Sequence, residues 1–128
     1  MYEAEIFYKG SKITIMAIKK ISPGGRERIY IEEFLDSLGK HERQRVIAFI
    51  RKVADSGFPK NPNKFKKLSA YDLWEFRIHT KPQIRIFLSS DFLKNIAYLV
   101  NGARKGNVKK IVYENAQEIL EKFLEKED

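Results

Sequence analysis

The segment LWEFRIHTK, residues 73–81, alternates apolar and charged side chains with a period of two. Successive side chains of a β-strand leave opposite faces of the sheet, so this alternation predicts a strand with one apolar and one charged face. The two faces divide as Trp74, Phe76 and Ile78 against Glu75, Arg77, His79 and Lys81.

The residues that follow extend this strand into a meander. Thr80-Lys81-Pro82-Gln83 has the composition of a turn, and Ile84, Ile86 and Leu88 then repeat at the spacing of a second strand. A second turn region over residues 89–95 leads into a third strand, predicted over residues 96–101. Three consecutive strands joined by turns predict an antiparallel sheet.

The segments on either side of the meander add helices and more strands. Residues 4–20 predict two strands around a turn, and apolar residues at helical spacing predict two helices between Arg28 and Gly57. Residues 58–67 are expected to form a basic loop, and Val112 to Phe123 a C-terminal helix. The fold class is therefore α+β: a small, mostly antiparallel sheet with an N-terminal αα-hairpin and a C-terminal helix packed on one face of it. One domain is expected over residues 1–128, with residues 1–27 as an N-terminal strand extension.

The composition restricts the classes of function. The formal net charge is +8, and basic residues far outnumber acidic ones between Lys40 and Lys67. A solvated helix face would explain any single lysine, but the whole set favours a nucleic-acid surface that includes Lys64, Lys66 and Lys67. With no cysteine and two histidines, neither a metal site nor a cofactor is expected. No apolar run reaches the length of about 18 residues that a membrane span needs, and the N-terminus lacks the pattern of a signal peptide, so a cytoplasmic protein is expected.

The charged face of the meander is the candidate site. Antiparallel pairing would place Arg85 across from the charged residues of the first strand. Arg104 and Lys105 follow the third strand, and Tyr113 opens the last helix. We expect these residues to form a basic cleft with one imidazole and one phenol: Arg77, His79, Lys81, Arg85, Arg104, Lys105 and Tyr113.

Such a set suits the cleavage of RNA, in which the 2′-hydroxyl is the nucleophile. The protein must then move two protons and stabilise charge on the phosphate. Arg85 and Arg104 are the candidates for holding the phosphate, because a guanidinium group matches its oxygens and does not deprotonate. His79, Lys81 and Tyr113 are the candidates for proton transfer, a lysine or tyrosine with its pKa lowered by nearby cations. Two simpler interpretations stay open: His79 as a solvated residue, and Arg77 as an ion-pair partner of Glu75.

Several motifs resemble the RelE/HigB group of toxins from toxin–antitoxin systems, within the RelE/ParE superfamily. They are Phe65-Lys66-Lys67-Leu68, Leu73-Trp74-Glu75-Phe76-Arg77 and Ile84-Arg85-Ile86-Phe87, and the phage-type HigB branch is the most similar. The resemblance covers roughly residues 28–124. It implies that His79 and Lys81 stand where the RelE pattern has catalytic lysines, and that Arg85 stands at the arginine of its "YR" strand. It further implies that Gly102-Ala103-Arg104 corresponds to its "GKR" segment, and that Val112-Tyr113-Glu114-Asn115-Ala116 is similar to the segment that holds its catalytic tyrosine.

The resemblance implies a metal-independent endoribonuclease, an mRNA interferase, that cleaves mRNA on the ribosome and is neutralised by a cognate antitoxin protein. Arg77, Lys64, Lys66, Lys67 and Lys105 would then contact the RNA. Two alternatives remain at this point. One is a ParE-like inhibitor of gyrase, and the other is a nucleic-acid-binding protein without catalytic activity.

Overall fold

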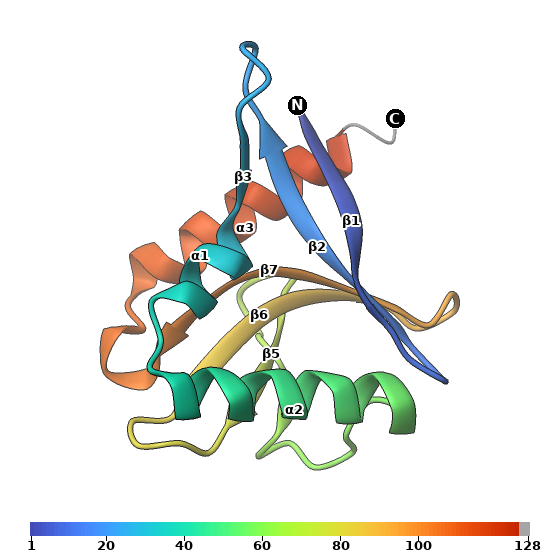
Figure 1. Ribbon diagram of the computed structural model, residues 1–128, viewed down its shortest axis with the longest axis vertical. Helices are drawn as coiled ribbons and strands as arrows, with labels where there is room; N and C mark the ends of the chain where they lie inside the picture. Colours follow the sequence, from blue (N-terminus) through green and yellow to red (C-terminus); the bar gives the residue numbers. More distant parts are fainter. Residues whose placement is uncertain (126–128) are drawn as a thin grey trace.

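The computed structural model describes residues 1–125, which form one sheet of seven strands and three α-helices (Figure 1). The elements follow in the order β1 (Tyr2–Lys9), β2 (Thr14–Ile21), β3 (Glu27–Ile29), α1 (Tyr30–Asp36), α2 (Lys40–Ser56), β4 (Phe65–Lys67), β5 (Trp74–Ile78), β6 (Ile84–Asp91), β7 (Ile96–Arg104), the 3-10 turn η1 (Lys105–Asn107) and α3 (Lys110–Glu125). This order confirms the predicted α+β class. Within residues 1–125, no helix is long and apolar enough to cross a membrane.

The strands of the sheet are ordered β1-β2-β7-β6-β5-β4, and β3 pairs with β2. Every pairing is antiparallel except that of β2 with β7, which is parallel. The meander predicted from the period-two pattern is β5-β6-β7. The N-terminal strands add to its β7 side, so the segment predicted as an extension completes the central sheet.

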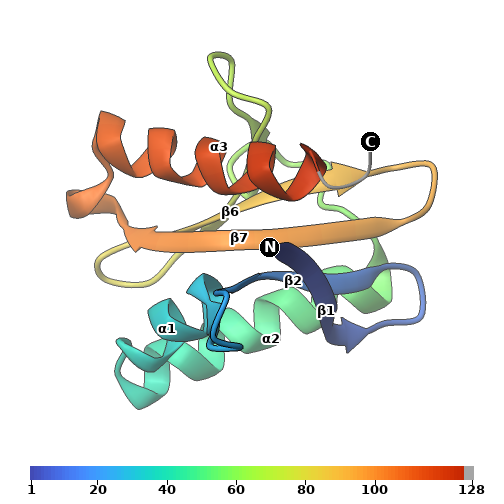
Figure 2. The ribbon, with the colours of Figure 1, turned by 90° about the horizontal axis from the view of Figure 1, so that it is seen from above.

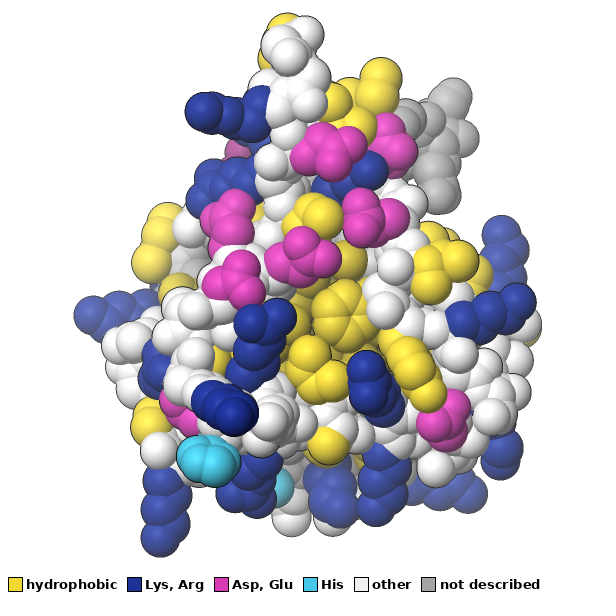
Figure 3. Space-filling view, viewed as in Figure 1, with side chains coloured by type: hydrophobic (Ala, Val, Ile, Leu, Met, Phe, Trp, Pro, Cys, Tyr) yellow, Lys and Arg dark blue, Asp and Glu magenta, His cyan; other side chains and the backbone are white. Residues whose placement is uncertain are grey.

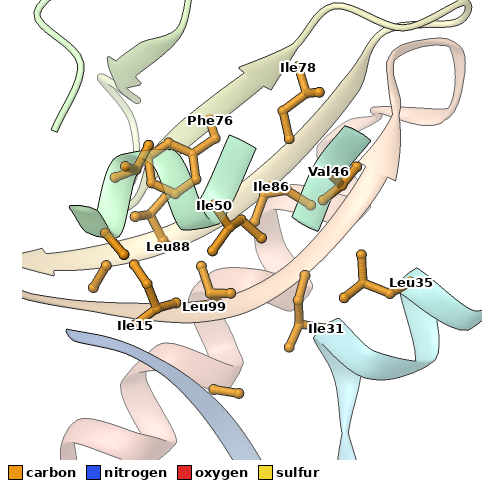
Figure 4. Close-up of a cluster of buried hydrophobic side chains, with 14 of the residues drawn as sticks. Ile15, Ile31, Leu35, Val46, Ile50, Phe76, Ile78, Ile86, Leu88 and Leu99 are labelled. Carbon is orange, nitrogen blue, oxygen red and sulfur yellow. The ribbon is translucent and has the colours of Figure 1, made fainter. Parts of the chain in front are cut away.

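The helices divide between the two faces of the sheet, whereas the sequence predicted them on one face. In Figure 2, α3 lies on one side of β6 and β7, while α1 and α2 lie on the other. One buried cluster joins α1 and α2 to the sheet through residues such as Ile31, Ile50 and Phe76 (Figure 4). A second cluster joins α3 to the opposite face through Phe87 and Leu120. The meander is therefore covered on both sides, which removes the open charged face that its alternation predicted.

Two segments differ in detail from the predicted elements. Phe65–Lys67, expected within a basic loop, forms the short edge strand β4, because the buried Phe65 ring stacks on Trp74 with centroids 4.4 Å apart. Strand β7 also continues to Arg104, beyond its predicted end at residue 101. Gly102 within β7 allows this packing, since a Cβ there would lie 2.5 Å from the ring of Phe34 in α1.

Candidate functional site

A buried carboxylate joins two arginines on the α3 face of the sheet. Glu75 of β5 is fully buried, and its Oε1 atom accepts hydrogen bonds from Arg77 Nε at 2.7 Å and from Arg85 Nη1 at 2.9 Å. The two arginines are cross-strand partners on β5 and β6, which places both guanidinium groups beside the same oxygen. A buried carboxylate is costly unless it is paired, so Glu75 fixes both arginines in place. We call Glu75, Arg77 and Arg85 the arginine cluster.

Within residues 1–125, the arginine cluster has one unpaired hydrogen-bond acceptor, and its two arginine side chains are partly exposed. The second carboxylate oxygen, Glu75 Oε2, is buried and has no hydrogen-bond partner among the described residues. The side chains of Arg77 and Arg85 are 22% and 12% exposed, so both guanidinium groups remain partly accessible. Two arginines and one carboxylate leave an excess positive charge, which suits the binding of an anion such as a phosphate.

Gln83 links the arginine cluster to His79. Its Oε1 accepts a hydrogen bond from Arg85 Nε at 3.1 Å, and its Nε2 lies 2.9 Å from Nδ1 of His79. The amide nitrogen can only donate, so Nδ1 of His79 accepts, and the proton of the neutral ring is assigned to Nε2. That nitrogen lies 3.2 Å from the carbonyl oxygen of Asn63, which completes the chain of hydrogen bonds. Both ring nitrogens of His79 are therefore engaged.

His79 and Lys81 lie beyond the end of the strand on which the sequence placed them. Strand β5 ends at Ile78, and both residues are exposed in the turn before β6. Among the described residues, hydrogen bonds link His79 to the arginine cluster only through the side chain of Gln83. The turn contains a cis peptide bond between Lys81 and Pro82, and Lys81 has no hydrogen bond or ion pair among the described contacts.

Tyr113 stands close to the arginine cluster, at the start of α3. Its ring stacks with Tyr71 at 5.5 Å and meets Phe87 edge-on at 5.3 Å. Burial is the main cause that raises the pKa of Tyr113, and the charge of Glu75 raises it further, while Arg85 and Arg77 lower it by less. The sequence suggested a phenol whose pKa nearby cations lower, and the structure corrects this expectation. Tyr113 keeps its proton at neutral pH, which suits a proton donor better than a base.

Arg104 lies on the opposite face of the sheet from Arg85. Its cross-strand partner on β6 is Ile84, whose side chain is buried in the cluster beneath α1 and α2. Arg104 Nη2 donates to Glu42 Oε1 of α2 at 3.0 Å, and this hydrogen bond is the main cause that lowers the pKa of Glu42. The structure thus brings Arg85, Arg77, His79 and Tyr113 together but does not bring Arg104 to them.

The predicted RNA-contacting lysines lie at the surface in different surroundings. Lys64 and Lys66 are exposed, while Lys67 Nζ donates to the carbonyl oxygens of Leu68 and Tyr71. Lys105 is exposed, and its backbone N–H donates to Gln83 O at 2.7 Å, which places the start of η1 beside the β5–β6 turn. Among residues 1–125, no three His, Asp or Glu side chains gather in a way that would hold a metal ion.

Sequence reasoning considered Glu75 only as a possible ion-pair partner of Arg77, and it placed Gln83 in a turn without a role in the site. The signal for Glu75 was present, because residues two apart on a strand share a face and Glu75 precedes Arg77 at that spacing. Gln83 gave no signal, since its role depends on the turn that brings it back to His79.

The fold and the arginine cluster define a small basic α+β protein with two partly exposed arginines held by a buried carboxylate at one end of its sheet. Residues 33–124 match the family of phage-derived Gp49-like proteins (DUF891). This match spans most of the sequence, so the chain belongs to that family, which is toxin-like and related to the RelE/HigB proteins. No curated protein matches the chain significantly.

Proposed function

We propose that this protein is the toxin of a toxin–antitoxin system and acts as a metal-independent endoribonuclease on mRNA. The observation that carries the proposal is the arginine cluster, in which a buried carboxylate aligns two guanidinium groups next to a protonated phenol. Positive charge fixed in advance where negative charge develops is usually the largest contribution to catalysis of this kind. The toxin-like family and the resemblance to RelE/HigB support the same assignment.

The proposed reaction uses the 2′-hydroxyl of the RNA as its nucleophile. A bond forms between O2′ and the phosphorus, and the bond between the phosphorus and O5′ breaks. Arg85 and Arg77 contact the non-bridging oxygens, whose charge grows in the transition state. Tyr113 donates its proton to the departing O5′, and the resulting phenolate lies beside the two arginines. The products are a 2′,3′-cyclic phosphate and a 5′-hydroxyl.

His79 is the proposed acceptor of the proton from the 2′-hydroxyl. Its Nδ1 already accepts a hydrogen bond from Gln83, so the RNA must replace that bond before the imidazole can act as a base. Release of Gln83 also frees one hydrogen bond of Arg85, because both bonds are made by the same amide. Lys81 in the β5–β6 turn and Lys105 beside that turn would contact the neighbouring phosphates, whereas Arg104 would contact RNA only from the other face.

Primer extension on translated mRNA tests this function. The wild-type protein should produce discrete stops, and the fragments should carry 2′,3′-cyclic phosphate ends, whether or not the protein has been stripped of metal with EDTA before it is added to the translation reaction. Arg77→Ala should reduce cleavage about 10²-fold, the usual scale for the loss of one contact to transition-state charge, whereas Arg26→Ala, in an exposed turn, should leave it unchanged. Inhibition of DNA gyrase without any RNA cleavage would overturn the proposal in favour of a ParE-like activity.

We further propose that the partner is an antitoxin whose acidic or helical segment covers the arginine cluster. A carboxylate from such a segment would complement the excess positive charge and exclude the phosphate. Co-expression with the neighbouring gene should yield a stable complex that neither cleaves RNA nor slows growth. Unimpaired growth of cells that produce the protein alone would contradict a toxin.

A further inference from the structure

A hollow lies at the same end of the sheet as the arginine cluster, on the side of α2. It has a volume of about 580 Å³ and is formed by α2, the segment 56–64 and the end of β5. This volume is within the range of roughly 300–1,000 Å³ that is typical of small-ligand sites. Its walls are partly aromatic, because Phe49 of α2 and Phe58 of the segment after α2 both line it.

The aromatic walls are held rigidly by their own packing. Phe49 meets Phe76 edge-on with ring centroids 5.3 Å apart, and Phe58 stacks on Phe65 at 5.2 Å. Both walls therefore rest on the buried core of the sheet rather than on mobile surface side chains. A preformed apolar hollow loses little conformational entropy when a flat ring enters it.

The rim of the hollow is cationic and carries no acidic side chain. Its cations are Arg45, Lys52 and Lys64, and the imidazole of His79 and the ion-paired Arg77 also line it. Among the described residues, Arg45, Lys52 and Lys64 form no ion pair, so no carboxylate of the described residues neutralises these three cations. Figure 3 shows the same segregation, with Lys and Arg side chains crowded along the α2 edge and Asp and Glu gathered around β3 and α1. An apolar interior with unpaired cations at its rim suits a ligand with a flat ring and an anionic group.

The hollow is connected to the arginine cluster through His79. The imidazole lines the hollow and is also linked by Gln83 to Arg85. A chain that carries a phosphate at Arg85 can therefore pass over His79 and reach the hollow with its next unit. A nucleic-acid strand carries both a phosphate and a flat base in each unit, whereas the carboxylates of an acidic protein segment match only the cations, so the aromatic lining favours a nucleic-acid strand.

We propose that this hollow is a base-binding subsite for single-stranded RNA. One nucleotide adjacent to the scissile phosphate places its base between Phe49 and Phe58, and Lys52 and Arg45 contact its phosphates. The subsite deepens the proposed function, on which its position relative to the scissile phosphate rests. A base inside the hollow must be unstacked, so single strands bind and duplexes do not.

The test fills the hollow by a substitution and measures binding without cleavage. The probe is a fluorescent RNA hexamer of mixed sequence with 2′-O-methyl groups, which cannot be cleaved because the nucleophile is blocked. Ala48→Trp places a bulky ring in the hollow from an exposed position, and Gln44→Trp, one turn earlier on α2 and outside the hollow, is the matched control. The hexamer should bind about tenfold more weakly to Ala48→Trp, the scale of one lost stacking contact, and with unchanged affinity to Gln44→Trp.

A second pair of variants tests the rim and covers the case in which the new tryptophan itself stacks on RNA. Lys52→Glu and Lys40→Glu change the net charge equally, but only Lys52 lines the hollow. Lys52→Glu should weaken hexamer binding several-fold more than Lys40→Glu. In addition, adenosine monophosphate should shift the amide resonances of α2 and of residues 57–64, whereas inorganic phosphate should leave those of the aromatic wall unchanged.

Equal affinities within both variant pairs would overturn the subsite. Loss of the complex with a protein partner in Ala48→Trp, with hexamer binding unaltered, would overturn it in favour of a protein-docking site. The outcome is separable from the proposed function. If the protein binds the hexamer through the hollow but never cleaves mRNA, the subsite stands and the catalytic assignment is wrong. If Ala48→Trp cleaves mRNA with an unchanged KM, the catalytic assignment stands and the subsite is wrong.

Discussion

Arg85 and Arg104 lie on neighbouring strands, yet they serve opposite faces of the sheet. Arg85 meets the fully buried Glu75 beneath α3, and Arg104 meets the partly exposed Glu42 of α2. The cause is a bulge in β7: Phe87 pairs with Asn101 and Leu88 with Leu99, which leaves Val100 as an extra residue. An extra residue reverses the alternation beyond it, so Arg104 turns away from the face that Val100 and Phe87 share.

One residue of register therefore decides which arginine belongs to the site. Without the bulge, the period of two that starts at Val100 would place Arg104 on the same face as Arg85. The two arginines would then flank a single phosphate, as the sequence predicted. With the bulge, only Arg85 remains beside Arg77 and Tyr113, and Arg104 instead ties β7 to the start of α2.

The largest expected effect comes from neutralising Glu75, the buried carboxylate of the arginine cluster, and Glu42 on the opposite face is the comparison. Glu75→Gln keeps the shape of the side chain but leaves two arginines in the arginine cluster without their counter-charge. Breaking a buried ion pair costs about 3 kcal/mol or more, so the free energy of unfolding in urea should fall by about that amount. Glu42→Gln, whose side chain is 23% exposed, should cost clearly less. Equal losses in the two variants would contradict the distinction between the two faces.

A smaller effect, on the rate of mRNA cleavage, is expected when the hydroxyl group of Tyr113 is removed. Tyr113→Phe retains the ring contacts with Tyr71 and Phe87 but removes the proposed proton donor. Cleavage of mRNA should slow about tenfold or more, because general acid catalysis contributes at least that much, while unfolding in urea should stay nearly unchanged. Ultraviolet titration of the wild type should also show tyrosines that ionise above the ordinary range, because the pKa values of Tyr2, Tyr8 and Tyr113 are all raised, and one of these steps should be missing in Tyr113→Phe. A Tyr113→Phe enzyme with full activity would remove the phenol from the mechanism.

The smallest effect concerns pH on the α2 face. Arg104 lowers the pKa of Glu42 in the folded protein, so this pair stabilises the fold at pH values above the ordinary glutamate range. The stabilisation is lost as the pH falls through the lowered folded pKa. The difference in unfolding midpoint between the wild type and Glu42→Gln should therefore be present at pH 7 and disappear in acid. A difference that persisted or grew in acid would show that the ion pair with Arg104 is not its source.

Much of the fold could be predicted from local patterns. The alternation in residues 73–81 and 84–88 gave β5 and β6, and helical spacing gave α2, which ends at Gly57 with a positive φ of 101°. The division of the helices between two faces could not be predicted in this way. The strand pattern assigns Glu75 to a polar, solvent-facing side of the sheet. In the structure α3 covers that face, and Glu75 is buried there because the two arginines neutralise its charge.

The site was predictable in its residue types but not in its geometry. Arg77, Arg85, His79 and Tyr113 were all named from the sequence, and the expected pairing of Arg77 with Glu75 is confirmed. The bulge at Val100 could not be located from the sequence, because the adjacent Asn101-Gly102 is equally typical of a turn and does not fix which residue is extra. The direction of the pKa of Tyr113 likewise depends on burial by neighbours that are distant in the chain.

Cleavage of translated mRNA by Arg85→Ala and Arg104→Ala, measured side by side with the wild type, shows which face of the sheet holds the scissile phosphate. Arg85→Ala should lose about 10²-fold or more in the cleavage rate, the scale of one transition-state charge contact. Arg104→Ala should lose at most about tenfold, because that arginine lies on the opposite face from Arg85. Full activity in Arg85→Ala, or a loss in Arg104→Ala as large as that in Arg85→Ala, would contradict a catalytic site on the α3 face.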